Sequence, residues 1–577
     1  MSHAAHDGVP DGGVPDGTTG AHVADGNAEK EESRMPSYGQ RRSTMDEKHR
    51  SDGKIVITEA DIYDKLGFRY PWWKKWAIIS VIALVQTSMN WNASFYASSV
   101  KPIGKHFHVS QQAARVGQMI FLVCYGFGSE LWAPWSEEIG RWPILQLSLF
   151  FVNIWQIPCA LAPNFGTIIV CRALGGLSSA GGSVTLGMVA DMWEPDDQQF
   201  AVAFVVLSSV AGSAFAPIAG GPVGEWLSFR WNFWIQLILG GTVQAIHFWV
   251  PETRCSILLD REAKKRRKNG ENVYSIGEVE KKKFSMKPII IVWLRPFLMF
   301  VREPIVLWLS LLSGFSDALI FTFLQAYTPV YKQWGFGPVR TGLAFIPIII
   351  GYAIAYLSFL PWISRHTKIR KRDPDALQPE SRLYWLLFTA PLETIGLFGF
   401  AWTSLGPPHV HWIAPMIFSC CIAIANYAIY MATIDYMVAA YGPYSASATG
   451  GNALARDVLA GIAAMYSTPM YEHMGTALHL EWPSTLLGCL AIFITAPIYI
   501  FYWKGPTIRE RSEFAQYLAS DRKAKGEMAV RCGSDVEGAE YTYLSQSVRS
   551  SHRGSHRGCQ PADGAGPRGR SDGGPEV

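Results

Sequence analysis

The stretch Arg172–Gly221 begins R-A-L-G-G-L-S-S-A-G-G-S, continues through the acidic turn D-M-W-E-P-D-D at 191–197 and ends G-S-A-F-A-P-I-A-G-G. It joins two long apolar runs at a tight turn, and both runs are rich in small residues. Small residues at this spacing let two helix backbones approach closely in lipid, where packing drives association. Proline is tolerated there because neighbouring helices satisfy the carbonyl group that it frees. The stretch therefore predicts two tightly packed membrane helices.

The composition of the whole chain also indicates a membrane protein. Its 577 residues are 49% hydrophobic and only 17% charged, which is too apolar for a soluble protein of this length. The nine cysteines show no spacing of the kind that binds a metal, so neither a metal nor another cofactor is expected. The chain has no G-x-x-x-x-G-K-[ST] loop for ATP and no plausible Ser/His/Asp set, and it predicts neither an enzyme nor a nucleic-acid partner.

Twelve apolar runs approach the roughly 20 residues that a helix needs to cross a bilayer. They lie at 76–97, 114–134, 143–162, 166–189, 199–222, 232–250, 304–327, 341–361, 384–404, 413–434, 446–469 and 483–503. Between the sixth and the seventh, the segment Arg254–Arg302 holds thirteen Lys/Arg and five acidic residues. We therefore expect an all-α membrane protein with twelve transmembrane helices in two six-helix halves.

The predicted domains follow from these runs. A Gly/Asp/Pro-rich, disordered tail occupies residues 1–70, and the N-terminal half occupies 71–253. A basic linker at 254–302 precedes the C-terminal half at 303–505, and a low-complexity tail occupies 506–577. The linker side is far richer in Lys and Arg than the opposite side. The positive-inside rule therefore predicts that the linker and both termini are cytosolic.

The turn between the second and third helices reads A-P-W-S-E-E-I-G-R-W-P at 133–143. Its key members are Pro134, Glu137, Gly140 and Arg141. In so short a turn, Glu137 and Arg141 can form charge pairs that break when helices rock, and we expect a gate for alternating access. A capped turn that only fixes topology is the alternative.

Arg172 lies inside the fourth helix and cannot lose its proton, so it must find a carboxylate, carbonyl groups or water. We expect it to pair with a titrating acid or an anionic substrate, and a structural arginine that snorkels is the alternative. Four amides in other helices are candidates either for binding a polar substrate or for hydrogen bonds between helices. They are Asn90, Asn92, Gln325 and Asn452.

Four acids lie within predicted helices, where ionisable residues are costly and usually functional. Asp317 lies near the midpoint of the seventh helix and Glu393 in the ninth, and we rank these two first as proton-coupling residues. Asp457 and Glu130 rank below them. Arg456 neighbours Asp457, but adjacent helical residues point about 100° apart, so we do not expect each to be the main partner of the other. Neutral acids that only hold helices together are the alternative.

These motifs resemble the Major Facilitator Superfamily, in the twelve-helix drug/proton antiporter branch found in fungi. P-W-S-E-E-I-G-R at 134–141 resembles the helix 2–3 motif of that branch, with Glu137 where an aspartate is usual. Arg172 and Gly176 match the helix-4 motif, although Gly175 replaces its glutamine. Further matches are F-R-W-N-F-W at 229–234, P-E-T at 251–253, R-P-F at 295–297, E-P-I at 303–305, P-E-S-R-L at 379–383 and Y-S-A-S-A-T-G-G-N-A-L-A-R at 444–456.

The helix-5 antiporter motif is matched by Gly212, Pro217, Gly220 and Gly221, with Ala216 in place of a glycine. The resemblance implies that these residues pack the fifth helix closely and limit leakage. It also implies proton-coupled export of drugs, polyamines, organic acids, glycolipids or secondary metabolites by alternating access. The expected partners are a small-molecule substrate, protons and the lipid bilayer, and the expected state is a monomer.

Departures from the polyamine-type members narrow this expectation. Gln325 stands in F-L-Q-A-Y where those members have a glutamate, and Asp435-Tyr436 replaces an Asn-Tyr pair. We therefore expect an acidic or amphipathic metabolite rather than a polycation. Uptake of an organic acid or nutrient is the alternative within transport, and a non-transporting receptor or sensor is the alternative of another class. The expected location is the plasma membrane, with the vacuolar membrane as the alternative.

Overall fold

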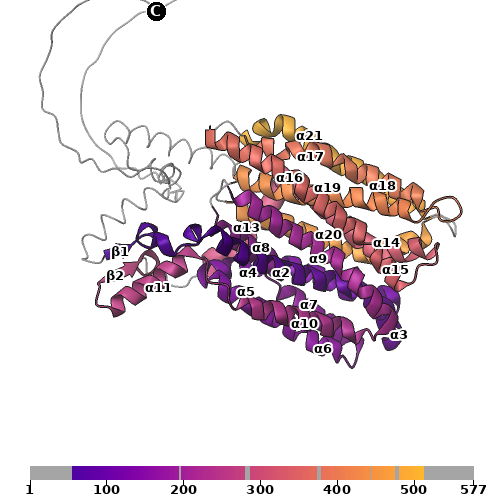
Figure 1. Cartoon of the computed structure of the whole chain (residues 1–577), viewed down its shortest axis with the longest axis horizontal. Helices are drawn as coiled ribbons and strands as arrows, with labels where there is room; N and C mark the ends of the chain where they lie inside the picture. The colour runs from indigo at the N-terminus through magenta and orange to yellow at the C-terminus, as the bar shows by residue number, and fades with distance from the viewer. Residues whose placement is uncertain are drawn as a thin grey trace, which may run out of the picture. The chain divides into compact units, whose positions relative to one another are not determined.

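The structure, a computed structural model, is dominated by helices (Figure 1). It describes residues 55–193, 197–279, 286–372, 378–441, 444–474 and 480–512. The helices of the N-terminal half are α2 (Trp72–Phe95), η3 (Tyr96–Ser99), α3 (Val100–Phe107), α4 (Gln111–Glu138), α5 (Arg141–Ile154), α6 (Gln156–Ala160), α7 (Phe165–Leu177), α8 (Gly181–Ala190), α9 (Gln198–Trp226) and α10 (Arg230–His247).

The C-terminal half follows a linker with its own secondary structure. The linker contains α11 (Cys255–Lys268), β2 (Val273–Ser275), α12 (Ile276–Val279) and α13 (Met286–Arg302). The C-terminal half contains α14 (Pro304–Lys332), α15 (Pro338–Leu343), α16 (Ile346–Arg372), η4 (Pro379–Leu383), α17 (Tyr384–Thr389), α18 (Pro391–Thr403), α19 (Ile413–Tyr441), α20 (Ser445–His473) and α21 (Glu481–Glu510).

Each of the twelve predicted runs coincides with one helix or with two consecutive helices. Among the described residues, eight of these segments are long and apolar enough to cross a membrane. The other four are α2, α4, α10 and α20. They carry many polar side chains, such as Gln86, Asn90 and Asn92 in α2, and these lower their mean hydropathy. The twelve-span count therefore stays a prediction.

Four predicted runs are interrupted or shifted in the structure. The third is divided into α5 and α6 at Trp155, and the fourth into α7 and α8 at 178–180. The ninth is divided into α17 and α18 at Ala390, because the following Pro391 lacks the N–H group that would continue the hydrogen bonding. The eighth continues beyond its predicted end at residue 361, since α16 reaches Arg372.

The prediction of disorder up to residue 70 is wrong for residues 55–70. Here β1 (Ile55–Ile57) pairs in parallel with β2, and the short helices η1 (Glu59–Lys65) and η2 (Gly67–Arg69) follow. Ile57, Ile62 and Leu66 pack against Leu259 of α11 in a small separate core. These apolar residues have a partner surface only after the linker has folded. The prediction of a tail from residue 506 is likewise wrong at its start, because α21 continues to Glu510. The remaining parts of the two predicted tails, 1–54 and 513–577, lie outside the described residues.

The linker core lies beyond one end of the membrane helices, here named the linker end (Figure 1). The opposite end, which carries α3, α6 and α15, is named the far end. Between the halves, α4 packs on α20 and α9 packs on α15, α16 and α19. These two contacts, the α4–α20 seam and the α9–α16 seam, bring the candidate site residues of both halves together.

Candidate functional site

A cluster of charges lies between α14 and α20. Arg456 Nε lies 3.8 Å from Asp317 Oδ2, and Arg456 Nη2 lies 3.8 Å from Asp457 Oδ1. The central carbon of the guanidinium, Cζ, also lies over the ring of Tyr430, 3.9 Å from the ring centre. The guanidinium thus lies equally near both carboxylates, so Asp457 is a partner of Arg456 but no closer a partner than Asp317.

This charged cluster has unused hydrogen-bonding capacity. Within the described part of the chain, Arg456 Nη1, Asp457 Oδ2 and the nearby Asn452 Nδ2 are buried without a hydrogen-bond partner. A buried polar group without a partner costs free energy, so each of these atoms would gain from water or from a polar ligand. Asp317 is the most accessible acid of the cluster, with a side chain that is 17% exposed.

Two glycines bring the acids onto the α4–α20 seam. A β-carbon on Gly126 would lie 3.2 Å from the β-carbon of Asp457, and one on Gly450 would collide with the Glu130 carboxylate. Glu130 lies one turn beyond Gly126 on α4, closer to the linker end. The structure thus places Asp457 and Glu130 along the contact between the halves, a position that the sequence did not predict for either.

Glu393 is fully buried in α18, away from this seam. Neither of its carboxylate oxygens has a hydrogen-bond partner among the described residues. An ionised carboxylate in such surroundings would be unstable, so a neutral acid fits the site better. Nearby on α14, Ser316 accepts a hydrogen bond from Asn426, whose own oxygen accepts one from Tyr352.

Arg172 has carbonyl oxygens and aromatic rings as partners instead of a carboxylate. It donates to Gly117 O at 3.0 Å and to Asn92 Oδ1 at 2.8 Å, and its guanidinium lies 4.1 Å from the ring centre of Phe121. The side chain is 2% exposed, and its Nη2 has no partner in the described residues. These bonds tie α7 to α2 and α4, and no carboxylate among the described residues pairs with the positive charge.

The remaining predicted amides form bonds between helices. Asn90 donates to Ser209 of α9 at 3.2 Å, and Gln325 of α14 donates to Gln118 of α4 at 3.0 Å. The second bond joins the two halves. Asn92 holds Arg172, while its own Nδ2 group is without a described partner. The amides therefore contribute both contacts between helices and free polar groups inside the bundle.

The turn between α4 and α5 carries an ion-pair network. Gly140 adopts φ +120°, a conformation that favours glycine, and Pro134 lies buried within α4. Arg141 Nε donates to Asp191 Oδ2 at 3.1 Å, whereas the expected partner Glu137 lies 3.9 Å away and is half exposed. Asp191, in the turn after α8, is therefore the main partner of Arg141.

Glu252, in the P-E-T triplet, caps the same turn. Its carboxylate accepts hydrogen bonds from the backbone N–H groups of Arg141 and Trp142 at 3.0 and 3.2 Å, and from those of Thr253 and Arg254 at 2.9 Å each. All of these groups belong to the N-terminal half or to its junction with the linker. In this structure the network therefore links elements of the N-terminal half to one another and to the start of the linker.

A second network lies at the linker end of the C-terminal half. Glu380, in P-E-S-R-L, accepts two hydrogen bonds from Arg509 at 2.8 and 2.9 Å, and Arg382 pairs with Asp435 of α19. Gln199 of α9 then donates to Asp435 Oδ2 at 2.6 Å and joins the two halves. Sequence reasoning missed Gln199, since a single glutamine at a helix start gives no signal.

The helix-5 glycines pack as closely as their spacing predicts. A β-carbon on Gly212 would lie 2.7 Å from Thr87 O of α2, and one on Gly220 would lie 2.9 Å from the Ser98 side chain. Gly221 contacts the C-terminal half instead, because a β-carbon on it would lie 2.8 Å from Pro338 O of α15. The carbonyl group of Pro217 similarly touches Gly342 of α15. The series therefore contacts both halves.

The halves touch at both ends of the seams. Near the far end, Gln112 of α4 donates to Met465 O of α20 at 2.8 Å, in addition to the contact of Gly221 with α15. At the linker end, Gln199 bonds to Asp435, and Tyr427 donates to Ala203 O at 3.0 Å. Among the described residues, the two halves are therefore in contact at both ends of the seams.

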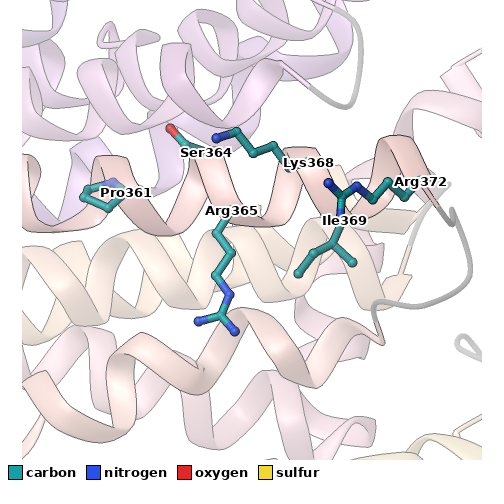
Figure 2. Close-up of a pocket in the computed structure, with 6 residues that line it drawn as sticks. All are labelled: Pro361, Ser364, Arg365, Lys368, Ile369 and Arg372. Atoms are coloured by element: carbon teal, nitrogen blue, oxygen red, sulfur yellow. The ribbon is translucent and has the colours of Figure 1, made fainter.

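A basic groove of about 580 Å³ lies at the linker end of α16. Its lining residues are Pro361, Ser364, Arg365, Lys368, Ile369 and Arg372. Figure 2 shows that Lys368 and Ser364 point to one side of α16, whereas Arg365 points to the other. The groove is therefore a cationic surface along one helix, and its side chains do not converge on an enclosed binding site.

A sequence profile of the Major Facilitator Superfamily matches residues 81–465, which is more than half of the chain. This chain belongs to the Major Facilitator Superfamily. The match covers most of both halves and includes Arg172, Asp317 and Arg456. The chain is therefore a multi-pass membrane protein of a transporter family, in agreement with the resemblance seen in its motifs.

Fungal members of the superfamily are similar over most of their length. The transporter paaT of Penicillium rubens is 32% identical over 446 residues, which cover 76% of this chain and 80% of paaT. The efflux pump FUBT of Fusarium oxysporum is 28% identical over 458 residues, which cover 78% of this chain and 76% of FUBT. Relatives of this superfamily member thus include proteins named as efflux pumps.

Among solved structures, the proton:xylose symporter XylE has a TM-score of 0.50 and 16% identity to this chain. The similarity covers 74% of this chain and 95% of XylE. At this identity the likeness concerns the fold alone. Together with the family match, it confirms the predicted major facilitator fold.

Proposed function

We propose that this superfamily member is a proton-coupled exporter of a small acidic or amphipathic metabolite. The observation that carries the proposal is the cluster in which Arg456 lies 3.8 Å from both Asp317 and Asp457. When both acids are ionised, the cluster has one negative charge in excess. Two charges 4 Å apart interact by about 4 kcal/mol at an effective dielectric constant of 20, so one bound proton changes the energy of the site substantially.

The position of Asp457 couples this proton to the movement of the halves. Because Asp457 packs on Gly126 of α4, its charge lies on the seam that must open and close during alternating access. Protonation neutralises the cluster and favours the closed seam, while an ionised Asp457 favours water and an open seam. Asp317, Asp457 and Glu130 are therefore the proposed proton-coupling residues of the seam, and Glu393 is proposed as a neutral acid that supports α14.

The surroundings of Arg172 favour an anionic substrate. It is buried with an unpartnered Nη2 and with no carboxylate beside it in the described residues. A substrate carboxylate, or another anionic group, would supply the missing counter-charge and accept the free N–H groups of Nη2. Asn92, which holds the guanidinium, would orient it. The basic groove on α16 would attract such an anion to the linker end.

Three observations support export from the cytosol, and the proposed location is the plasma membrane. Relatives include a named efflux pump, the helix-5 glycines match the antiporter motif, and the basic linker favours a cytosolic linker end. In the proposed cycle, the bond from Gln199 to Asp435 closes the cytosolic end. The Arg141 network keeps the N-terminal half rigid while the halves rock as a monomer.

The test uses the purified full-length chain in proteoliposomes with a panel of fungal organic acids and other small metabolites. We expect transport of an acidic or amphipathic member to follow an imposed pH gradient. Asp317→Asn and Asp457→Asn should abolish gradient-driven transport and retain substrate exchange at equal pH. Asp64→Asn, a change at an exposed site outside the membrane, is the matched control.

Each other result has a distinct meaning. Transport that continues at full rate in both variants would contradict the proton role of the cluster. Substrate flux in the same direction as the protons would establish uptake instead of export. Arg172→Lys should raise the KM for the acid at least tenfold, since a single ammonium group cannot keep the bonds to Gly117 and Asn92 and also bind the acid. An unchanged KM would remove Arg172 from the proposed substrate site.

A further inference from the structure

Helix α13 carries an apolar stripe on its surface. Ile290, Leu294, Phe297 and Val301 are exposed, and their spacing of four, three and four residues places them on one helical face. Leu294 is 61% exposed and Val301 is 78% exposed. With 17 residues, α13 is shorter than the roughly 20 that a bilayer crossing requires. These properties are typical of a helix that lies in the membrane interface.

One side of α13 is fixed to α4 of the N-terminal half. Trp293 Nε1 donates a hydrogen bond to Glu130 O at 3.1 Å. Phe297 stacks on Phe127 of α4, with ring centres 6.2 Å apart. Phe127 is itself exposed on the outer surface of α4. The apolar stripe of α13 is therefore continuous with an exposed apolar surface of α4, a helix that the family fold places in the membrane.

The other contacts of α13 are with α20 of the C-terminal half. A β-carbon on Gly451 would lie 3.2 Å from Pro296 O, so the helices touch at this glycine. The Arg295 guanidinium lies 5.1 Å from the ring centre of Tyr444, which precedes α20. Together with the α4 contacts, these interactions place α13 across the linker end of the α4–α20 seam.

The chain changes direction between α13 and α14. Glu303 has φ −100° and ψ 106°, an extended conformation that the following Pro304 favours. Tyr441 of α19 donates a hydrogen bond to the Glu303 carboxylate at 3.3 Å and holds the bend in place. Since α13 does not continue the axis of α14, its apolar stripe is free to face the membrane surface.

We propose that α13 is an in-plane membrane helix that straps the α4–α20 seam. Its Ile290, Leu294 and Val301 face inserts into the phospholipid leaflet at the linker end, while Trp293 and Pro296 contact the two halves. The partner is the phospholipid surface, because the stripe joins the lipid-facing side of α4 through Phe127. This inference depends on the chain being embedded in a membrane and not on the proposed substrate or proton coupling.

The test measures the depth of α13 in proteoliposomes that contain only the full-length chain and phospholipid. Nitroxide labels are attached through Leu294→Cys and Val301→Cys in a cysteine-free background, with Lys268→Cys at the end of α11 as the control. We expect labels at 294 and 301 to collide several-fold more often with oxygen than with a water-soluble nickel chelate, and the label at 268 to show the reverse. Preference for nickel at 294 and 301 would overturn the proposal and assign the stripe to a protein partner.

A second measurement uses the unmodified chain, in case the cysteine-free protein does not fold. Vesicles contain a phospholipid with a photoreactive diazirine in its acyl chain, and adducts are mapped by mass spectrometry. We expect adducts in the segment 290–301 and none in 261–268 of α11. Adducts that are absent from 290–301, while they occur on the membrane spans, would overturn the proposal.

Discussion

Gln199, at the start of α9, donates its side-chain amide to the Asp435 carboxylate of α19 across 2.6 Å. Arg370 of α16 donates to the oxygen of the same amide at 2.7 Å. One glutamine of the N-terminal half is thus held by an anion and a cation of the C-terminal half. Because the amide satisfies both charges at once, it closes the linker end without adding a charge of its own.

We predict that Gln199→Leu opens the linker end. A hydrogen bond to a charged group contributes about 1.5–3 kcal/mol, so its loss should raise the open population roughly 10- to 100-fold. The measurement is the distance distribution between spin labels at the exposed positions Glu138 and Lys504. Gln198→Leu, one residue earlier and outside this bond, is the control and should leave the distribution unchanged. Equal distributions for both variants would show that the bond does not hold the halves.

We predict that Glu252→Ala destabilises the folded protein strongly. Four backbone N–H groups lose their buried acceptor, which should cost about 3 kcal/mol or more. Glu137→Ala should cost about 0–1 kcal/mol, because its ion pair is 3.9 Å long and half exposed. Thermal unfolding in detergent, followed by size-exclusion fluorescence, compares the two variants. A larger loss for Glu137→Ala would contradict this assignment.

We predict that Gly221→Ala disturbs the far end. The new methyl group would lie 2.8 Å from Pro338 O, and overpacking of this kind costs about 1–3 kcal/mol. We therefore expect a lower unfolding temperature and faster leakage of protons through the chain in liposomes. Gly224→Ala is the control on the same helix, since its nearest contact is 3.9 Å away. Tight vesicles with Gly221→Ala would exclude a sealing role for this glycine.

We predict that acid weakens the linker core. Arg267 donates to both oxygens of Glu278 and lowers the pKa of this carboxyl below its ordinary value of 4.5. The hydrogen bond from Lys65 likewise lowers the pKa of Glu262. A lowered carboxyl pKa contributes stability above the ordinary value and loses it as the pH falls through the lowered pKa. The docking of β1 on β2 should therefore hold at pH 7 and weaken below pH 4.5.

Hydrogen–deuterium exchange of the peptide 55–66, corrected for the intrinsic pH dependence, measures this docking. Glu278→Gln should reduce the protection at pH 7 and flatten its response to acid. Glu271→Gln, at an exposed position of the same segment, is the control. Protection that is equal at pH 7 and pH 3.5 in the unmodified chain would show that these ion pairs do not stabilise the core.

Local patterns predicted the helices well. Apolar runs located the membrane helices, and the small-residue series of the fifth helix predicted its close packing through Gly212, Gly220 and Gly221. The pairing of charges was harder to predict. Arg141 has Glu137 four residues before it, yet it binds Asp191, which lies 50 residues away along the chain. The reason is burial, because the side chain of Asp191 is 12% exposed whereas that of Glu137 is 48% exposed.

The sequence by itself determined the membrane class, the order of the helices and the expected side of the linker. These properties depend on run length and charge counts along the chain, since lipid obliges each segment to satisfy its own backbone hydrogen bonds. Only the tertiary structure decided that Arg456 lies beside two acids and that Gln199 donates a hydrogen bond to Asp435, 236 residues away in the sequence. The contacts of α13 with both α4 and α20 were likewise decided by the tertiary structure. Such contacts depend on the rotation and register of packed helices, which hydrophobic periodicity does not encode.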